Sequence, residues 1–247
     1  TAWWQKDSKL SAPKNSNLKT VMDFSFFDKI NTAKNEQTET WFKGLDRIYN
    51  NFVYDFLYPN PASVLAFIEN HDTDRFLGEG DNLPMLKQAS TLLLTTRRIP
   101  QLYYGTEVMM NGVKSKSDGY VRKDFPGGWT GDATNALTPA GRTKIQNECY
   151  DFYKTILNWR KGNDVIAKGS MVQFMVQNGV YAYARQYEGK TVFVMLNGTD
   201  AETTVPLKFY KEILKDSKQG KDILSGKAIT FGEELKMGPR ESLVIEL

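Results

Sequence analysis

The stretch 67-FIENHDTDRF-76 decides the fold, because an apolar run changes there within a few residues into a polar and charged one. His71 is the single histidine of the 247-residue chain, and it stands between Asn70 and Asp72. The run 63-SVLAFIE-69 that leads into it is typical of a parallel strand covered on both faces. We therefore expect a polar site at the end of a buried strand.

The surrounding segments alternate between strand and helix patterns. Strand-like runs occur at 18-LKTVMDF-24 and 99-IPQLYYG-105, and helix patterns cover residues 35–56, 83–98 and 138–162. Such alternation is typical of a parallel α/β sheet. Active sites of these sheets gather at the carboxyl ends of the strands, which is where the polar stretch falls.

The predicted helices carry recognisable start signals and buried faces. Residues 35–56 place an apolar side chain at every third or fourth position, as one buried helix face requires. Its members are Trp41, Leu45, Ile48, Phe52 and Phe56. Pro84 marks the start of the second helix, and Thr138 with Pro139 predicts the N-cap and first position of the third.

Past residue 165 the pattern changes to short β-rich runs separated by turn residues. The runs are 170–176, 179–187, 190–197, 202–207, 227–231 and 241–247. Asn178-Gly179 and Glu188-Gly189 separate the first three, and the second pair predicts a two-residue hairpin. We predict an α/β part over residues 1–163 and an antiparallel β-sandwich domain over residues 164–247.

Composition narrows the classes of function. Lys and Arg exceed Asp and Glu by 32 to 29, and the positive charges are scattered, which disfavours a nucleic-acid partner. No apolar run approaches the ~20 residues that a membrane span needs. The single cysteine, Cys149, excludes an internal disulfide and lies in an amphipathic helix pattern, so we expect it to be buried.

The polar stretch admits several kinds of site. No G-x-S-x-G segment accompanies His71 and Asp72, which argues against a Ser-His-Asp triad. One histidine also argues against zinc. The remaining alternatives are a structural, hydrogen-bonded histidine and a site for a polar substrate. The cluster of five polar groups at a strand end favours the substrate site.

Four segments together resemble the α-amylase superfamily, glycoside hydrolase family 13. They are 3-WWQKDS-8, 21-VMDFSF-26, 67-FIENHD-72 and 98-RIPQLYYGTE-107, and their order matches that family. More narrowly, they resemble the neopullulanase and cyclomaltodextrinase-like members. The resemblance implies strands six to eight of a (β/α)8 TIM barrel with their helices, followed by a C-terminal β-sandwich.

The resemblance also implies an activity, namely retaining hydrolysis of α-1,4 and, as an alternative, α-1,6 glucosidic bonds in maltooligosaccharides, cyclodextrins or pullulan. His71 and Asp72 would then hold hydroxyls of the sugar under attack and stabilise the transition state. Asn70 and Arg75 are expected to bind substrate beside them. An α-glucan transglycosylase is the alternative on the same scaffold.

A second substrate-binding site is implied in 113-VKSKSDGYVRKDFPGGW-129, where Asp118 and Arg122 match an Asp-x-x-x-Arg segment of related enzymes. Trp129 offers a stacking face there, although 125-FPGGW-129 departs from the family's commoner form. An ordinary loop salt bridge is the competing interpretation of Asp118 and Arg122.

By the same resemblance the nucleophilic Asp and the acid/base Glu precede residue 1, so the chain alone is expected to be inactive. Glu69, Asp72, Asp74 and Glu107 are the carboxylates available inside the chain, and Asp72 with Glu107 is the pair we consider. Three strands cannot close a barrel, so their open edge predicts self-association as a homodimer.

Two further interpretations stay open. The chain could belong to a non-catalytic amylase-like partner subunit, although the intact 70–72 segment argues against it. The β-domain could instead be a carbohydrate-binding module if Tyr181, Tyr183 and Tyr187 form exposed platforms; their alternation equally fits sheet packing. No cofactor is required, and although calcium occurs in many relatives, no Asp-rich loop calls for it. Only the resemblance points to a periplasmic or secreted location.

Overall fold

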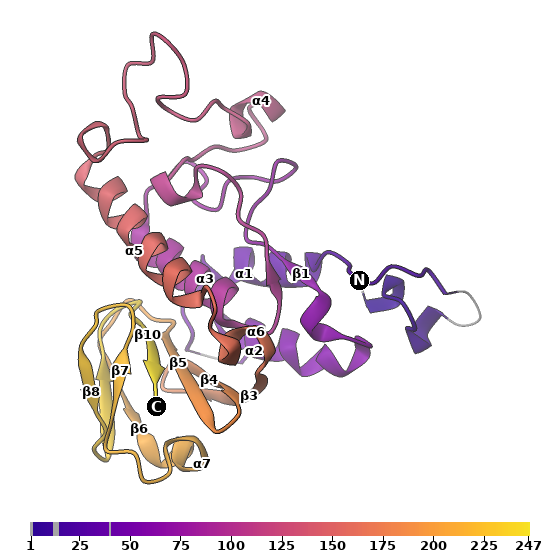
Figure 1. Cartoon of the computed structure of the whole chain (residues 1–247), viewed down its shortest axis with the longest axis vertical. Coiled ribbons are helices and arrows are strands. Elements are labelled where there is room, and N and C mark those ends of the chain that lie inside the picture. The colour runs from indigo at the N-terminus through magenta and orange to yellow at the C-terminus, as the bar shows by residue number, and fades with distance from the viewer. Residues whose placement is uncertain (1, 12–14, 40) are drawn as a thin grey trace.

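The computed structural model of the chain describes residues 2–11, 15–39 and 41–247. Figure 1 shows a helical part that contains α1, α2, α3 and α5, and a β-domain packed against one side of it. The helices are α1 Phe24–Ala33, α2 Asp46–Val53, α3 Leu83–Thr95, α4 Asp118–Val121, α5 Lys144–Arg160, α6 Asp164–Lys168 and α7 Lys211–Leu214.

Extended segments in the helical part pair in parallel, as the alternating pattern predicts. The strand β1 (Leu65–Ala66) pairs with β2 (Ile99–Pro100). On the other side of β1, a parallel bridge joins Leu65 to Met22, and Gln5 bridges Leu18 in the same way. The regular strands are much shorter than the predicted runs 63–69 and 99–105, because the parallel register covers only the pairs Leu65–Ile99 and Ala66–Pro100.

The segment between the first two parallel strands differs from the prediction. A helix begins directly at Phe24, with the Asp23 side chain accepting a hydrogen bond from the Phe26 amide at 3.0 Å. The predicted helix over 35–56 shrinks to α2 and a short 3-10 turn, Tyr54–Leu57; its residue 40 lies outside the described residues. Thr38 explains the shortening, because its amide donates to the Gly198 carbonyl at 3.0 Å and ties this segment to the β-domain.

The predicted buried face of that helix is therefore only half correct. Leu45, Ile48 and Phe52 are buried in the core. Trp41 and Phe56 are 72% and 77% exposed, since neither lies in the α2 helix that buries the other three.

The helices α3 and α5 confirm the later helix predictions, with one correction. Asn82 caps α3 and Pro84 lies in its first turn. The α5 helix begins at Lys144, five residues later than predicted, behind a capping box formed by Thr143 and Gln146. Thr138 caps a separate 3-10 turn, Pro139–Gly141.

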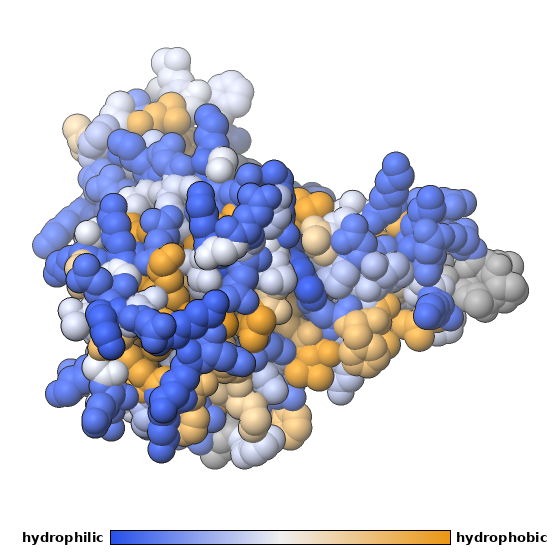
Figure 2. Space-filling model, turned by 60° about the horizontal axis from the view of Figure 1, so that its bottom comes forward, coloured by the Kyte–Doolittle hydropathy of each residue, from blue (hydrophilic) through white to orange (hydrophobic). Residues whose placement is uncertain are grey.

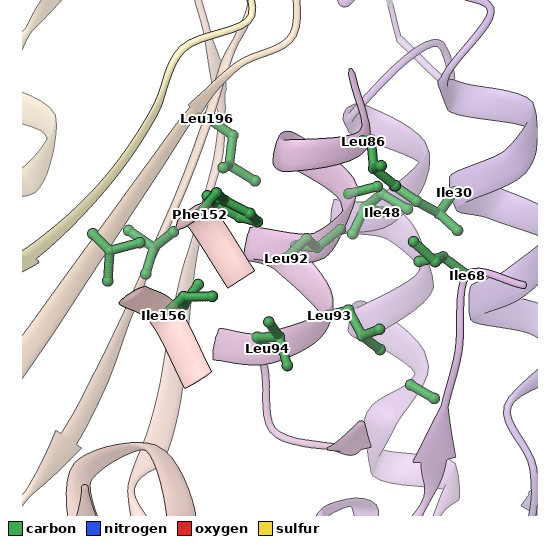
Figure 3. Packing of buried hydrophobic residues seen from close by; sticks show 14 of the residues in the cluster. Ile30, Ile48, Ile68, Leu86, Leu92, Leu93, Leu94, Phe152, Ile156 and Leu196 are labelled. Atoms are coloured by element: carbon green, nitrogen blue, oxygen red, sulfur yellow. The ribbon is translucent and has the colours of Figure 1, made fainter. Parts of the chain in front are cut away.

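The hydrophobic core is centred on α3, which packs on both sides. Figure 3 shows its leucines between α1, α2 and β1 on one side and α5 and the β-domain on the other. The labelled members are Ile30, Ile48, Ile68, Leu86, Leu92, Leu93, Leu94, Phe152, Ile156 and Leu196. Cys149 is fully buried in this cluster, as predicted.

The β-domain consists of a six-stranded antiparallel sheet, in the order β3-β4-β5-β10-β7-β8, and a two-stranded sheet, β6-β9. Their bounds are β3 Ser170–Gln177, β4 Val180–Tyr187, β5 Lys190–Asn197, β6 Thr203–Pro206, β7 Gln219–Asp222, β8 Ala228–Thr230, β9 Glu234–Met237 and β10 Ser242–Glu246. Both predicted turns are two-residue hairpins whose central residues have positive φ, as a type I′ turn requires. Tyr181 and Tyr183 are fully buried, so they pack the sheet and present no exposed platform.

One arginine joins the two parts of the molecule. The buried Arg185 on β4 donates from Nη1 to the carbonyls of Thr95 and Thr96, at 2.9 and 2.8 Å, where α3 ends. Its Nη2 donates to the carbonyls of Ile166 and Gly169 at 2.9 and 2.8 Å. Burial lowers the pKa of Arg185 to about 10. The orientation of the β-domain against α3 and α6 is thus set by four charge-assisted hydrogen bonds.

Candidate functional site

The turn that follows β1 directs the only imidazole outward. The buried Asn70 accepts a hydrogen bond on Oδ1 from the Asp72 amide at 2.8 Å, and its own amide donates to Thr73 Oγ1 at 3.0 Å. These local bonds compete with continued strand pairing and close the turn. The His71 and Asp72 side chains consequently point to solvent, and each is 60% exposed.

His71 and Asp72 form a pair that a third side chain holds in place. His71 Nε2 lies 3.2 Å from Asp72 Oδ2. Arg122 Nη2 donates to Asp72 Oδ1 at 3.1 Å, and Arg122 Nε donates to the His71 carbonyl at 2.8 Å. An imidazole, a carboxylate and a guanidinium therefore converge at the end of β1, a set suited to the hydroxyl groups of a polar ligand.

Asp118 and Arg122, which the sequence predicts for a second substrate-binding site, adjoin this cluster. Arg122 Nη2 also donates to Asp118 Oδ2 at 3.1 Å. Lys114, which sequence reasoning missed, donates from Nζ to the Asp72 carbonyl at 3.0 Å and lies 3.5 Å from Asp118 Oδ1. The Asp118–Arg122 salt bridge therefore shares Arg122 with the His71–Asp72 pair. Exposed ion pairs of this kind add little stability, so the arrangement is not explained by folding alone.

The sequence predicts that Arg75 contacts substrate, but in the structure its side chain is fully buried beneath the turn. Its Nη1 lies 3.3 Å from Glu69 Oε1, and its Cζ lies 3.9 Å from the Tyr103 ring centre. Because it has no exposed surface, the Arg75 guanidinium supports the turn and is not accessible to a ligand. Asn70, also expected to bind substrate, is 3% exposed and shapes the turn in the same way.

The carboxylate pair considered inside the chain does not form. Asp72 has ion-pair partners in His71 and Arg122 among the described residues. Glu107 instead lines a separate cavity of about 530 Å³ together with Tyr103 and Tyr153. Glu69 is buried, and burial raises the pKa of its carboxyl group despite the nearby Arg75.

Trp129 stands apart from the cluster in an exposed turn. Its side chain is largely exposed, and its amide donates to Asp132 Oδ2 at 3.1 Å. Over the described ranges, no three His, Cys, Asp or Glu side chains gather as metal ligands. In the same ranges, none of the helices has the length and apolarity to cross a bilayer.

Comparisons with known proteins agree on one family. Residues 171–246 match the model of the cyclo-malto-dextrinase C-terminal domain. An α-amylase of Niallia circulans is 28% identical over 221 residues, which are 86% of this chain and 37% of that protein. A cyclomaltodextrin glucanotransferase of Thermoanaerobacterium thermosulfurigenes is 30% identical over 212 residues, which are 83% of this chain and 27% of that protein. The chain thus spans well under half the length of these relatives.

Solved structures share the fold. An Anoxybacillus α-amylase superposes with a TM-score of 0.74 at 20% identity, covering 94% of this chain and 47% of that one. A Geobacillus thermoleovorans α-amylase, solved in complex with acarbose, gives a TM-score of 0.73, also at 20% identity, over 94% of this chain and 48% of that one. The fold of nearly the whole chain is therefore one found in α-amylases.

Proposed function

Because this chain is related to the α-amylase superfamily, glycoside hydrolase family 13, we propose that it supplies the sugar-binding side of an α-glucan-converting active site. The observation that carries the proposal is the exposed His71–Asp72 pair, fixed by Arg122 at the end of a parallel strand. The likeness to α-amylases and cyclomaltodextrin glucanotransferases supports an α-glucan as the substrate.

In this proposal the parallel segments are strands six to eight of a (β/α)8 barrel. Met22, β1 and β2 neighbour one another in chain order, which is the order of consecutive barrel strands. The β-sandwich then begins near residue 164, shortly before the matched domain at 171–246. The polar turn after β1 would lie at the carboxyl face, where barrel enzymes hold their substrates.

The chemistry we assign to the pair is transition-state stabilisation. As the bond to the sugar breaks, positive charge develops on the ring, and hydrogen bonds to its hydroxyls strengthen by several kcal/mol. Asp72 accepts such a bond and His71 donates one, while Arg122 keeps the carboxylate in place. Asp118 and Arg122 offer further partners for sugar hydroxyls at the rim of the same cluster.

The nucleophile and the acid/base of a retaining reaction lie, in this proposal, in a preceding part of the enzyme. A complete pair inside this chain lacks support, since Asp72 is paired with Arg122 and Glu107 lines a separate cavity. A retaining reaction needs two carboxyl groups about 5 Å apart across the scissile bond.

The test is reducing-sugar release from pullulan, cyclodextrin and maltooligosaccharides, measured with this chain and with a longer enzyme that contains it. We expect turnover by the longer enzyme and none by the chain. Robust turnover by the chain alone would mean that a complete carboxylate pair lies within these residues, and the assigned roles would be wrong. The trisaccharide released from pullulan distinguishes the two bonds and tests the neopullulanase-like assignment, because α-1,6 cleavage gives maltotriose and α-1,4 cleavage gives a trisaccharide that keeps an α-1,6 bond.

Transglycosylation is the second candidate, and it is favoured by the relatives named cyclomaltodextrin glucanotransferase. The two reactions share the same covalent intermediate and differ in whether water or a sugar hydroxyl attacks it. Chromatography of the products separates them, because transfer yields chains longer than the starting maltooligosaccharide or new cyclodextrins.

Self-association as a homodimer also belongs to the proposal. Large apolar side chains are exposed near the parallel segments and on the 3-10 turn after α2, including Trp3, Trp4, Phe24 and Phe56. Figure 2 shows such hydrophobic residues at the surface where the N-terminal segment joins the rest of the molecule. Surfaces of this kind favour association, and analytical ultracentrifugation of the chain measures it.

A further inference from the structure

We propose that Arg75 is a positioning residue whose buried guanidinium sets where Arg122 meets Asp72. The inference rests on the proposed function, because the Asp72–Arg122 contact is part of the sugar-binding cluster. Arg75 itself has no exposed surface, and its side-chain hydrogen bonds go to Val121, Glu69 and Tyr104. It acts through the backbone of the segments that surround it.

The first link leads directly to Arg122. Arg75 Nε donates to the carbonyl of Val121 at 3.0 Å. Val121 is the last residue of α4 and the immediate neighbour of Arg122, and it is buried. The α4 helix has only four residues, so its own hydrogen bonds are too few to hold it against the turn. The bond from Arg75 fixes the point from which the Arg122 side chain extends.

The second link leads to the segment after β2. Arg75 Nη1 donates to the Tyr104 carbonyl at 2.6 Å, and the guanidinium lies over the Tyr103 ring. The backbone amide of Arg75 donates to the Gly112 carbonyl at 3.0 Å, at the start of the loop that leads to α4. One residue therefore joins three segments that are distant in sequence: the turn after β1, the segment after β2, and α4.

A buried counterion makes this arrangement sustainable. Glu69 lies 3.3 Å from Arg75 Nη1, and its other oxygen accepts from the Phe76 amide at 2.5 Å. The Thr106 hydroxyl donates to the same carboxylate. A buried cation without such a partner would be strongly unfavourable. Burial raises the pKa of the Glu69 carboxyl group, while the hydrogen bonds from Thr106 and Phe76 and the charge of Arg75 act in the opposite direction.

The shape of the side chain matters as well as its charge. The planar guanidinium presents Nε and Nη1 to two carbonyls and a carboxylate at fixed angles, while its face rests on an aromatic ring. A lysine keeps the charge opposite Glu69 but replaces the rigid fork by a compact ammonium on a flexible stem, which does not hold the Val121 and Tyr104 carbonyls at fixed angles. Arg75→Lys therefore separates the positioning role from the need for a buried charge.

The test uses the single histidine as a reporter. In a proton–carbon NMR spectrum the His71 Cε1–H signal is unique in this chain, and it senses the groups around Asp72 without any sugar present. We compare the unmodified chain with Arg122→Gln, Arg75→Lys and the double variant. We expect Arg122→Gln to move the signal, Arg75→Lys to move it at least half as far in the same direction, and the double variant to match Arg122→Gln.

Two results would overturn the proposal. One is a His71 signal that stays in place in Arg75→Lys while Arg122→Gln moves it. The other is a signal that neither variant moves, because the cluster would then not exist in solution. If Arg75→Lys fails to fold by circular dichroism, Glu69→Gln with Arg75→Gln replaces it, since that pair leaves no buried charge unpaired, and the same shift is expected.

Titration with maltotriose separates this inference from the proposed function. Arg75→Lys should weaken binding about as much as Arg122→Gln, and the double variant should bind no more weakly than Arg122→Gln. Additive losses would contradict action through Arg122. If no variant binds maltotriose while the His71 shifts follow the expected order, the proposed function fails and the positioning role stands.

Discussion

At the scale of single residues, the site is a small set of exposed charges mounted on buried ones. His71 and Asp72 face solvent, whereas Asn70 and Arg75, their neighbours in sequence, are buried and hydrogen-bonded. The exposed groups are available to a ligand, and the buried groups decide where they stand. This division explains why a polar stretch of six residues holds both a binding face and its support.

Asp72→Asn tests the exposed part in the longer enzyme. The amide keeps the shape of the side chain but loses the charge that accepts the strengthened hydrogen bond in the transition state. Loss of several kcal/mol corresponds to a fall in kcat of about a hundredfold or more. Steady-state kinetics on maltooligosaccharides measures it. Asp118→Asn is the matched control, and it should mainly raise KM; equal effects on kcat from both variants would contradict the separate roles.

Cys149 makes a prediction about pH. Burial raises the pKa of its thiol from an ordinary 9.0 to about 12. A thiol whose pKa is higher in the folded than in the unfolded state stabilises the fold fully at pH values below its unfolded-state pKa. This contribution is lost as the pH rises through the folded-state pKa. The free energy of unfolding should therefore decline between about pH 9 and 12. Urea titration at each pH measures it. Cys149→Ala should flatten part of that decline, and an unchanged slope would show that other groups cause it.

At the scale of elements, helix ends are determined by a few side chains. Thr143 and Gln146 form a reciprocal capping box at the start of α5, whereas Thr138 caps a single 3-10 turn. Thr143→Ala should cost about 1 kcal/mol of unfolding free energy, since the Gln146 amide loses its acceptor, the Thr143 hydroxyl. Thr138→Ala is the control and should cost less than half as much. Denaturant unfolding compares the two variants. A larger loss of unfolding free energy in Thr138→Ala would contradict the assignment of Thr143 as the N-cap of α5.

The elements also show which features local sequence reveals. Asn178-Gly179 and Glu188-Gly189 predict the turns between the first three strands, because glycine readily adopts the positive φ that each turn has. The α1 helix was missed, although Asp23 and the buried Phe26 and Ile30 give the cap and spacing that identify it. The shortening of the 35–56 helix could not be foreseen, because its cause is a bond from Thr38 to Gly198 in the other domain.

The same distinction holds for the site. The change from apolar to polar residues predicted the location of His71 and Asp72. Nothing in the spacing showed that Arg122 would reach them across 50 residues, or that Lys114 would join. Arg75 was expected to bind substrate because it belongs to the polar stretch at the strand end, and its burial depends on a partner, Glu69, that only the folded turn supplies.

At the scale of the whole molecule, the two parts form one packed unit. The core around α3 includes residues of the β-domain, and Arg185 bonds the Thr95 and Thr96 carbonyls across the junction and the Ile166 and Gly169 carbonyls next to it. Arg185→Met leaves those buried carbonyls without donors and should cost at least about 3 kcal/mol. It should also split a single thermal transition into two. Arg160→Met removes one bond to the Leu94 carbonyl and serves as the milder control; equal losses would deny Arg185 its role at the junction.

The central claim is that His71 and Asp72 bind an α-glucan, and one titration tests it most directly. The His71 Cε1–H signal is followed while maltotriose or β-cyclodextrin is added to this chain, with β-linked cellotriose as the control. The account predicts a saturable shift with the α-linked sugars that Asp72→Asn abolishes, and no shift with cellotriose. A signal that ignores all three sugars, or that responds equally to cellotriose, would contradict it.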